Sequence, residues 1–248
     1  MSNTLAFQLF SLKDYEGGWD AAFEAVKGLG IDTIEVWRGL VPANSDAREP
    51  IRAMRASLHK AGMKLTCGHL RIEDFKAHYE AWKKLLLDFG STDWVIPFAK
   101  AEDLAGWLAL LPEFREMADR LQADGLSLGY HNHSAELAKL GDKYVLEHLL
   151  DAMPQLKVQF HIGQFLPARG IRLSDWMRKY EGRICSLHVN DADSQGEARV
   201  GQGECRAEES IKTALDAGVD TFIIEMRLTR DTLDGVKRDV EFTRNLIR

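Results

Sequence analysis

The amino-acid sequence predicts an α/β protein that folds as a single (β/α)8 barrel, the TIM barrel fold, over residues 1–248. Short apolar runs alternate with longer amphipathic stretches along the whole chain, which is the pattern of repeated βα units. Eight runs and eight stretches follow one another, and a barrel of this kind uses roughly 200 to 250 residues as one unit. No linker rich in Pro, Gly or Ser interrupts them, so we expect no second domain.

The strands are expected at the apolar runs, which are rich in β-branched and aromatic residues. Their expected ranges are 5–10, 33–37, 64–69, 93–99, 126–132, 157–162, 184–190 and 221–226. The helices are expected where apolar residues recur at spacings of three and four, with Ser, Thr or Asp near several starts and Gly at several ends. Their expected ranges are 17–29, 46–61, 72–88, 103–123, 143–152, 173–181, 207–217 and 231–246.

An open, doubly wound sheet is the alternative fold. Such a sheet normally carries a Gly-rich phosphate-binding turn after its first strand. The first strand here reads "FQLFSLKD" and has no such turn. The closed barrel is therefore the preferred prediction.

Composition limits the classes of partner. The chain has 32 Lys and Arg against 38 Asp and Glu, a net charge of −6, which disfavours nucleic acid because a polyanion needs a basic surface. The first residues lack the pattern of a secretory signal, and no window approaches the roughly 18 uninterrupted apolar residues of a membrane span. The three cysteines, Cys67, Cys185 and Cys205, have no CxxC spacing. We expect a soluble, cytoplasmic protein with reduced thiols and no membrane partner.

The unusual polar residues lie at the expected carboxyl ends of strands, where TIM barrels carry their chemistry. Five of the eight histidines occupy such positions. The residues at or near these ends are Gln8, Glu35, His69, His131, Asn132, His133, Glu136, His161, Gln164, His188, Asn190, Asp191 and Glu225. Histidines scattered over a surface would not be expected to choose strand ends.

A divalent metal ion is the expected partner of these polar residues at the strand ends. Buried carboxylates without a counter-charge cost on the order of several kcal/mol each, and mixed imidazole and carboxylate ligands suit a divalent cation. The candidate ligands, one from each of the last four strand ends, are Glu136, His161, His188 and Glu225. Each also has a structural reading, such as an ion pair for Glu225 or a core histidine for His188. The candidate substrate contacts are Gln8, Glu35, His69, His131, His133 and Asn190.

At these residues the sequence resembles the sugar phosphate isomerase/epimerase group of xylose-isomerase-like TIM barrels, in the AP endonuclease 2 superfamily. The resemblance runs in order through "FQLFSLKD", "GIDTIEVW", "CGHL", "LGYHNHSAEL", "SLHVND", "VGQGE" and "FIIEM". The fifth-strand stretch, of the YHNHxxEF type, is the most specific. The resemblance implies a divalent metal held by a Glu, Asp, His, Glu set, in which His188 matches the histidine and Glu225 the last glutamate. The first glutamate maps to Glu136, or the position falls on His131 if that loop is shifted.

Two residues depart from the family pattern. His161 in "VQFHIGQF" stands where the family has an aspartate ligand, and Asn190 in "HVND" stands where it has a lysine. An imidazole in place of a carboxylate removes one negative charge, which tilts the preference from Mg²⁺ or Mn²⁺ towards Zn²⁺, Fe²⁺ or Co²⁺.

The chemistry expected of such a site is proton abstraction next to a carbonyl, with an enediolate intermediate. This chemistry would place the protein in carbohydrate metabolism. Glu136 and Glu225 are the expected acid and base of a metal-dependent isomerase or epimerase of a small sugar or sugar derivative. The alternatives are a metal-dependent dehydratase or lyase of a keto-sugar or cyclitol, a catalytically altered sugar-binding barrel, and an abasic-site endonuclease, which the net charge disfavours. The resemblance also suggests a homodimer.

Overall fold

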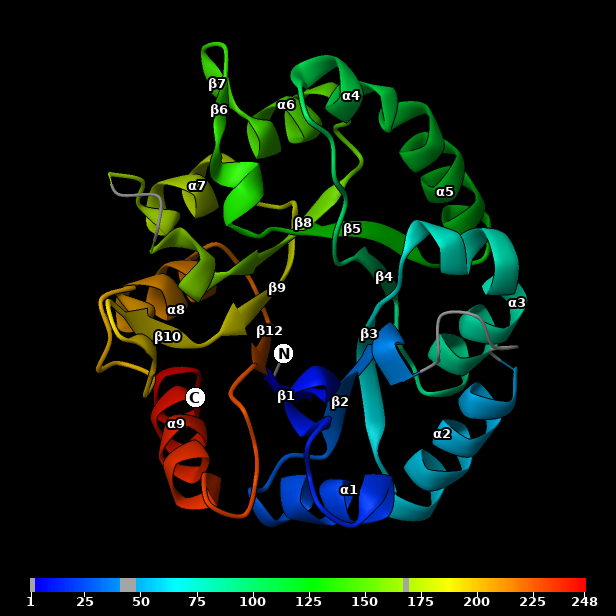
Figure 1. Cartoon of the computed structure of the whole chain (residues 1–248), viewed down its shortest axis with the longest axis vertical. Coiled ribbons are helices and arrows are strands. Elements are labelled where there is room, and N and C mark those ends of the chain that lie inside the picture. The colour runs from blue at the N-terminus through cyan, green and yellow to red at the C-terminus, as the bar shows by residue number, and fades with distance from the viewer. Residues whose placement is uncertain (1–2, 41–47, 167–169) are drawn as a thin grey trace.

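The eight predicted strands form a closed barrel of parallel strands (Figure 1), which confirms the predicted fold class. The computed structural model describes residues 3–40, 48–166 and 170–248. Around the barrel the strands follow the order β1-β12-β9-β8-β5-β4-β3-β2. Their bounds are β1 Thr4–Gln8, β2 Thr33–Trp37, β3 Lys64–His69, β4 Asp93–Ile96, β5 Ser127–His131, β8 Lys157–His161, β9 Ile184–Val189 and β12 Thr221–Ile224. The pairing of β1 with β12 closes the ring.

The helices surround the barrel (Figure 1). Their bounds are α1 Gly18–Gly28, α2 Arg48–Ala61, α3 Ile72–Asp88, α4 Leu104–Ala109, α5 Leu111–Ala123, α6 Val145–Ala152, α7 Leu173–Lys179, α8 Ala207–Asp216 and α9 Leu233–Leu246. Residues 46 and 47 of the second predicted helix lie outside the described residues. No helix in the described part of the chain combines the length and apolar character needed to cross a membrane.

The helix predicted over 103–123 is two helices, and Pro112 is the physical reason. Proline has no backbone N–H to donate to the preceding turn, so it is tolerated only in the first turn of a helix. Accordingly α5 begins at Leu111 with Pro112 in its first turn, and α4 ends at Ala109. The spacing of apolar residues continues across the break, which is why the sequence pattern alone predicts one helix.

Six strands end earlier than predicted: β5, β8 and β9 by one residue, β1 and β12 by two, and β4 by three. β4 ends at Ile96 because Pro97 follows it and cannot donate to a neighbouring strand. β1 ends at Gln8, whose side chain accepts a hydrogen bond of 3.2 Å from Phe10 N and so starts a short 3-10 helix, η1 (Leu9–Leu12). At the end of β1, Gln8 therefore points into the barrel, and Phe10 lies at its rim.

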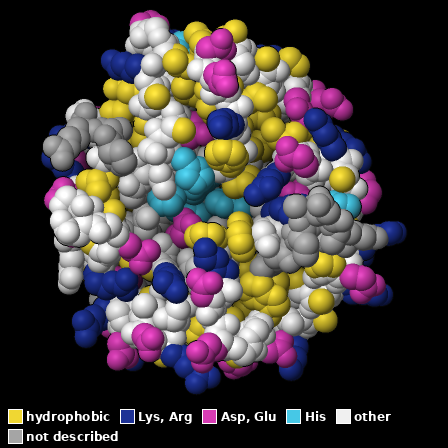
Figure 2. Space-filling view, in the orientation of Figure 1, with side chains coloured by type: hydrophobic (Ala, Val, Ile, Leu, Met, Phe, Trp, Pro, Cys, Tyr) yellow, Lys and Arg dark blue, Asp and Glu magenta, His cyan; other side chains and the backbone are white. Residues whose placement is uncertain are grey.

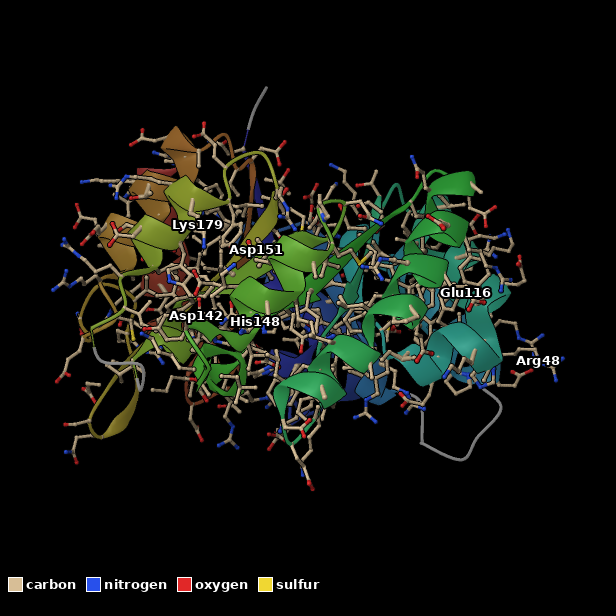
Figure 3. The ribbon with its side chains drawn as sticks, turned by 90° about the horizontal axis from the view of Figure 1, so that it is seen from above. Arg48, Glu116, Asp142, His148, Asp151 and Lys179 are labelled. Atoms are coloured by element: carbon tan, nitrogen blue, oxygen red, sulfur yellow. The ribbon has the colours of Figure 1, made fainter. Side chains whose placement is uncertain are left out.

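Two short hairpins were not predicted. β6 (Lys139–Leu140) pairs with β7 (Lys143–Tyr144), and β10 (Asp191–Asp193) pairs with β11 (Gly196–Ala198). Gly141 in the first turn and Gly196 at the start of β11 both have positive φ. Outside the barrel, Lys179 at the end of α7 (Figure 3) donates a 2.6 Å hydrogen bond to Glu147 of α6.

The barrel interior changes character along its axis. In the middle of the barrel, small or apolar side chains pack together, among them Ala6, Cys67, Val95 and Ile223. Side chains alternate between the two faces of a strand, so residues two positions further along point to the same interior. Those residues are Gln8, His69, Pro97 and Glu225. The middle of the barrel interior is therefore apolar, and the interior at the carboxyl ends of the strands is mostly polar.

Candidate active site

Four side chains converge at the carboxyl end of the barrel: His131, His161, His188 and Glu225. Each offers one ligand atom, and these atoms all lie within 4.8 Å of one another. They come from the ends of β5, β8, β9 and β12, which are consecutive neighbours in the barrel. Figure 2 shows the histidine surface at the bottom of a hollow near the centre of this face. We call these four residues the ligand cluster.

The spacing within the ligand cluster fits a divalent metal ion. Oε2 of Glu225 lies 2.7 Å from Nδ1 of His188 and 3.4 Å from Nδ1 of His161. Nε2 of His131 lies 3.0 Å from Nδ1 of His161. Imidazole nitrogens bind zinc at about 2.0–2.1 Å, which separates neighbouring tetrahedral ligands by roughly 3.4 Å. Small adjustments would therefore seat an ion among these four atoms.

Gln159, which the sequence analysis missed, fixes the tautomers of two histidines. Its Nε2 donates to Oε1 of Glu35 at 2.7 Å, so its Oε1 must be the acceptor for the rings on the other side. That oxygen lies 2.7 Å from Nδ1 of His131 and 2.5 Å from Nε2 of His69. Both of these nitrogens therefore carry hydrogen. The Nε2 lone pair of His131 is left to face the ligand cluster.

A signal for Gln159 exists in the sequence. It lies two residues before His161 in the run "KVQFHI", so it shares the interior face of β8 with that histidine. A glutamine in the middle of an otherwise apolar strand needs hydrogen-bond partners when it is buried. Reading only the strand ends leaves it out.

Glu35 lies beneath the ligand cluster and is fully buried. Its carboxylate accepts hydrogen bonds from Gln8, Cys67, Gln159 and His188. The contact with Nε2 of His188 is 2.6 Å. Glu35, His69 and His188 also form a second group with metal-ligand spacing. In this group the Glu35 carboxylate already contacts both imidazole rings. This carboxylate therefore serves to orient His188, as carboxylates behind metal-binding histidines do.

His188 lies between two carboxylates. Burial alone would lower its pKa, but Glu35 at Nε2 and Glu225 at Nδ1 raise the pKa to about 10. Burial tends to raise the pKa of Glu225, and His161 and His188 outweigh it and lower that pKa to about 2. In the metal-free protein His188 is therefore an imidazolium. A metal at Nδ1 would replace one proton, and the Nε2–H bond to Glu35 would remain.

The two departures from the family pattern contact each other. Oδ1 of Asn190 accepts a 2.8 Å hydrogen bond from Gly163 N, so its Nδ2 faces Nε2 of His161, also at 2.8 Å. In this arrangement the ring of His161 carries its hydrogen on Nδ1, the atom that faces the ligand cluster. Binding a metal through Nδ1 requires the proton to move to Nε2 and the amide of Asn190 to turn over. Burial lowers the pKa of His161 to about 3, which keeps the ring neutral.

Glu136 lies outside the ligand cluster, although it is fully buried. Oε1 accepts a 2.7 Å hydrogen bond from the hydroxyl of Tyr130, and Oε2 accepts one of 2.8 Å from His133 N. These bonds fasten the turn after β5. The metal-ligand and catalytic roles predicted for Glu136 stay predictions, and its contacts favour a supporting role. The cluster instead contains His131, the alternative position for the first ligand.

The other predicted substrate contacts divide by depth. Gln8 and Glu35 are fully buried within the barrel, and Gln8 faces Nδ1 of His69 at 3.2 Å. His69 and His133 line the mouth above the cluster. His133 is half-buried and its Nδ1 has no hydrogen-bond partner among the described residues. Burial lowers the pKa of His133, so its ring is neutral at neutral pH.

The mouth consists of two lobes that share Phe10 and Glu225. One, which we call the aromatic lobe, has a volume of about 280 Å³. It is lined by Phe10, Trp37, Arg38, His69, Arg71, Pro97, Phe98, His131, His133 and Glu225. The other, which we call the polar lobe, has a volume of about 400 Å³. It is lined by Phe10, Ser11, Lys13, Asp14, His161, Gln164, Asn190, Glu197, Glu225 and Arg227.

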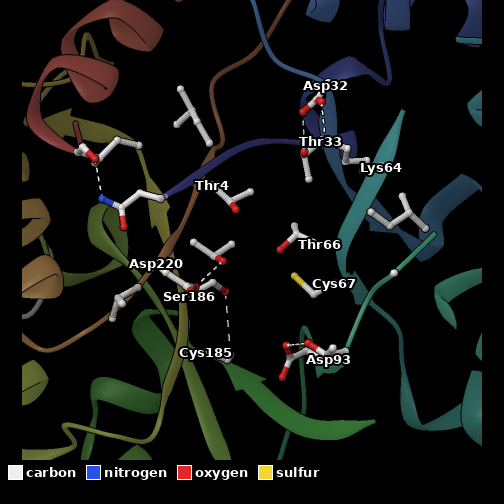
Figure 4. A pocket seen from close by; sticks show the side chains of 18 of the residues that line it. Thr4, Asp32, Thr33, Lys64, Thr66, Cys67, Asp93, Cys185, Ser186 and Asp220 are labelled. Atoms are coloured by element: carbon white, nitrogen blue, oxygen red, sulfur yellow. Dashed lines mark hydrogen bonds and ion pairs between the residues drawn. The ribbon is translucent and has the colours of Figure 1, made fainter. Parts of the chain in front are cut away.

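A larger cavity of about 1090 Å³ opens at the amino end of the barrel (Figure 4). Both lysines that line it are paired with carboxylates, Lys64 with Asp32 and Lys157 with Asp93. The ligand cluster does not reach it, because the apolar layer around Cys67 lies between. Size alone therefore does not identify the active site, because the cluster with metal-ligand spacing lies at the smaller opening.

A sequence profile of the xylose isomerase-like TIM barrel family matches residues 23–246. The chain belongs to this family. The family predicted from the strand-end motifs is thereby confirmed. A comparison with curated protein sequences finds no match.

Several solved structures share the fold of this family member. A sugar phosphate isomerase/epimerase from Parabacteroides distasonis has a TM-score of 0.77 at 18% identity, over 97% of both chains. A probable 3-DHS dehydratase from Bacillus anthracis has a TM-score of 0.75 at 13% identity, over 98% of this chain and 99% of that one. A D-psicose 3-epimerase from Clostridium cellulolyticum has a TM-score of 0.72 at 16% identity, over 99% of both. At these identities the likeness shows a shared barrel.

Proposed function

We propose that the protein is a divalent-metal-dependent isomerase or epimerase that acts on a small sugar or sugar derivative. The observation that carries this proposal is the convergence of four ligand atoms within 4.8 Å, at the floor of a mouth large enough for a small molecule. Membership in the xylose isomerase-like family and the epimerases among the similar structures support it.

The residues proposed to hold the ion are His131, His161, His188 and Glu225. Three imidazoles and one carboxylate favour Zn²⁺, Fe²⁺ or Co²⁺, with Mn²⁺ less suited and Mg²⁺ least. When bound, such an ion would polarise a substrate carbonyl and stabilise negative charge on the adjacent oxygen. Glu35 would hold His188 in the orientation that ligation requires, and Gln159 would do the same for His131.

Glu225 is the proposed base. It is the carboxylate that lines both lobes, and among the described residues its Oε1 has no hydrogen-bond partner. The lowered pKa of about 2 keeps it ionised at neutral pH. Oε1 would take the proton from the carbon next to the carbonyl, and the electrons of that C–H bond would form the C=C bond of the enediolate.

Return of the proton decides the product. If Glu225 gives the proton back to the neighbouring carbon, the result is an isomer with the carbonyl moved by one position. If a group across the mouth protonates the original carbon from the other face, the result is an epimer. His133 also lines the aromatic lobe, where its neutral ring would contact a substrate hydroxyl group rather than supply that proton. His69 and Asn190 would contact substrate hydroxyl groups.

A sugar-binding barrel without catalysis is the second candidate. The hydrogen bond from Asn190 to Nε2 of His161 favours it, since this bond leaves a hydrogen on the nitrogen that faces the ligand cluster. In that case the histidines and carboxylates would satisfy each other, as they do in the structure, and no ion would be needed.

The test is proton exchange at the substrate carbon. The protein, loaded in turn with Zn²⁺, Co²⁺ and Mn²⁺, is incubated with a panel of ketoses in D2O, and NMR and mass spectrometry follow the products. An isomerase or epimerase incorporates deuterium without loss of water, whereas a dehydratase loses water. Glu225→Gln should lower the exchange rate by roughly 10²- to 10⁴-fold.

The matched control is Asp32→Asn at the opposite end of the barrel, which should exchange at the rate of the unsubstituted protein. Exchange that survives Glu225→Gln at full rate would remove Glu225 as the base. Absence of exchange with every metal and ketose, combined with measurable sugar binding, would favour the binding barrel.

A further inference from the structure

The two lobes of the mouth differ in charge. The polar lobe carries the cations Lys13 and Arg227 and three carboxylates, those of Asp14, Glu197 and Glu225. Within it, Nε of Arg227 lies 3.6 Å from Asp14, so its positive charge is matched. An anionic group entering this lobe would meet more negative than positive charge.

The aromatic lobe holds fewer carboxylates and an arginine that is not paired with one in the described part of the chain. It carries Arg38 and Arg71, and Glu225 at the shared floor is the carboxylate that lines it. Figure 2 shows Lys and Arg side chains bordering the histidine surface. Arg38 is half-buried and held in place by Asp74, whose Oδ1 accepts a 2.9 Å hydrogen bond from its Nε. Arg71 is exposed, and its guanidinium has no carboxylate partner among the described residues.

The backbone fixes where Arg71 stands. It lies two residues after the end of β3 and caps the N-terminus of α3, where its N–H donates a 3.0 Å hydrogen bond to Oδ2 of Asp74. Asp74 is fully buried, so the same carboxylate anchors the main chain of Arg71 and the side chain of Arg38. Both guanidinium groups are therefore presented to one lobe from a rigid base, beside the aromatic wall of Trp37 and Phe98.

We propose that Arg71 recognises an anionic group of the substrate in the aromatic lobe, next to the ion pair that Arg38 forms with Asp74. This inference rests on the proposed function, because it takes the reacting carbonyl of the substrate to lie over the ligand cluster. A guanidinium presents paired N–H donors that match a carboxylate or a phosphate. The substrate would thus be a sugar acid or a sugar phosphate rather than a neutral sugar.

The test is equilibrium binding of three matched probes, D-gluconate, D-glucose 6-phosphate and D-glucose, measured by isothermal titration calorimetry at low ionic strength. Arg71→Gln should weaken binding of the preferred anion by about tenfold or more and leave D-glucose unchanged. Arg71→Lys should retain part of the affinity, because lysine keeps the positive charge but lacks the paired N–H donors of the guanidinium. Arg178→Gln, which removes an exposed charge on α7, should change none of them.

The two anions distinguish a carboxylate from a phosphate as the recognised group. Equal affinity for all three probes, no binding of either anion at tens of millimolar, or a loss caused by Arg227→Gln instead of Arg71→Gln would each overturn the proposal. The measurement is made on metal-free and on metal-loaded protein. Anion binding that depends on Arg71, without any metal uptake, would contradict the proposed function and support this inference. Metal uptake without anion binding that depends on Arg71 would contradict this inference and leave the proposed function standing.

Discussion

The two ends of the barrel treat ionisable side chains in opposite ways. At the amino end, Lys64 pairs with Asp32 (Figure 4), and Lys157 pairs with Asp93, each cation with its own carboxylate and within reach of water. At the carboxyl end, a single imidazole, His188, is shared by Glu35 and Glu225. Both nitrogens of His188 are buried there.

This difference separates charge placed for solubility from charge placed for chemistry. Exposed one-to-one pairs neutralise themselves and contribute about 0–1 kcal/mol each to stability. Buried groups with shared partners are costly when any one is removed, and they hold ligand atoms at fixed positions. The carboxyl end is therefore expected to be sensitive to substitution and to metal, and the amino end to neither.

The largest effect is expected from His188→Leu. Without the imidazole, the buried carboxylates Glu35 and Glu225 lose their shared partner, which should lower the free energy of unfolding of the metal-free protein by about 3–5 kcal/mol. Lys157→Met at the other end removes one member of a partly exposed pair and should cost less than about 1 kcal/mol. Urea unfolding of both variants measures the difference, and equal losses would abolish the contrast between the two ends.

Next in size is Gln159→Leu. The leucine cannot hold the tautomers of His131 and His69, so we expect metal affinity to fall by about 10- to 100-fold. Ser186→Ala, which removes one acceptor of Gln159 and leaves the contact to Glu35, should have a much smaller effect. Competition with a chromophoric chelator gives both affinities. If the two variants bind metal alike, Gln159 does not orient the ligands.

The pH dependence of stability sharpens the comparison. Burial lowers the pKa of His131 and His161 below 6.5, so the unfolded chain binds more protons and stability falls as pH drops from 6.5. The pKa of His188 is raised to about 10, so its contribution is complete below pH 6.5 and is lost as pH rises through 10. The metal-free protein should be most stable near pH 6.5. Urea midpoints between pH 4.5 and 9 test this, and a flat profile would contradict it.

The smallest effect is expected from Lys64→Met at the amino end. The pair with Asp32 is more than half exposed on both sides, so its loss should change the free energy of unfolding by less than about 1 kcal/mol. Metal content should stay the same, because the apolar layer separates this cavity from the ligand cluster. A change in metal content would mean that the two ends are coupled.

The barrel could be predicted because its signals are local. Each strand and helix shows its own periodicity, and the order of elements along the chain fixes a parallel arrangement. Local signals also explain the errors: apolar spacing runs on through the break before Pro112, and the hairpins at 139–144 and 191–198 are too short to show a period. Such details depend on single residues rather than on patterns.

The site could be predicted only in part. The rule that strand ends meet at one mouth brings His161, His188 and Glu225 together without any knowledge of their contacts. The roles of Glu35 and Gln159 depend on a hydrogen bond between residues 124 positions apart, across the barrel interior. Glu136 follows β5 closely enough to be a candidate, but the turn after that strand directs its carboxylate to Tyr130 and His133 N.

The most direct test of the account is the metal content of three proteins purified without added metal or chelator: the unsubstituted chain, His131→Gln and Glu136→Gln. Circular dichroism establishes that each is folded. We expect about one divalent ion per chain in the unsubstituted protein and in Glu136→Gln, and a substoichiometric amount in His131→Gln, because His131 belongs to the ligand cluster and Glu136 does not. Loss of metal in Glu136→Gln with retention in His131→Gln, or no metal in any of the three, would contradict the account.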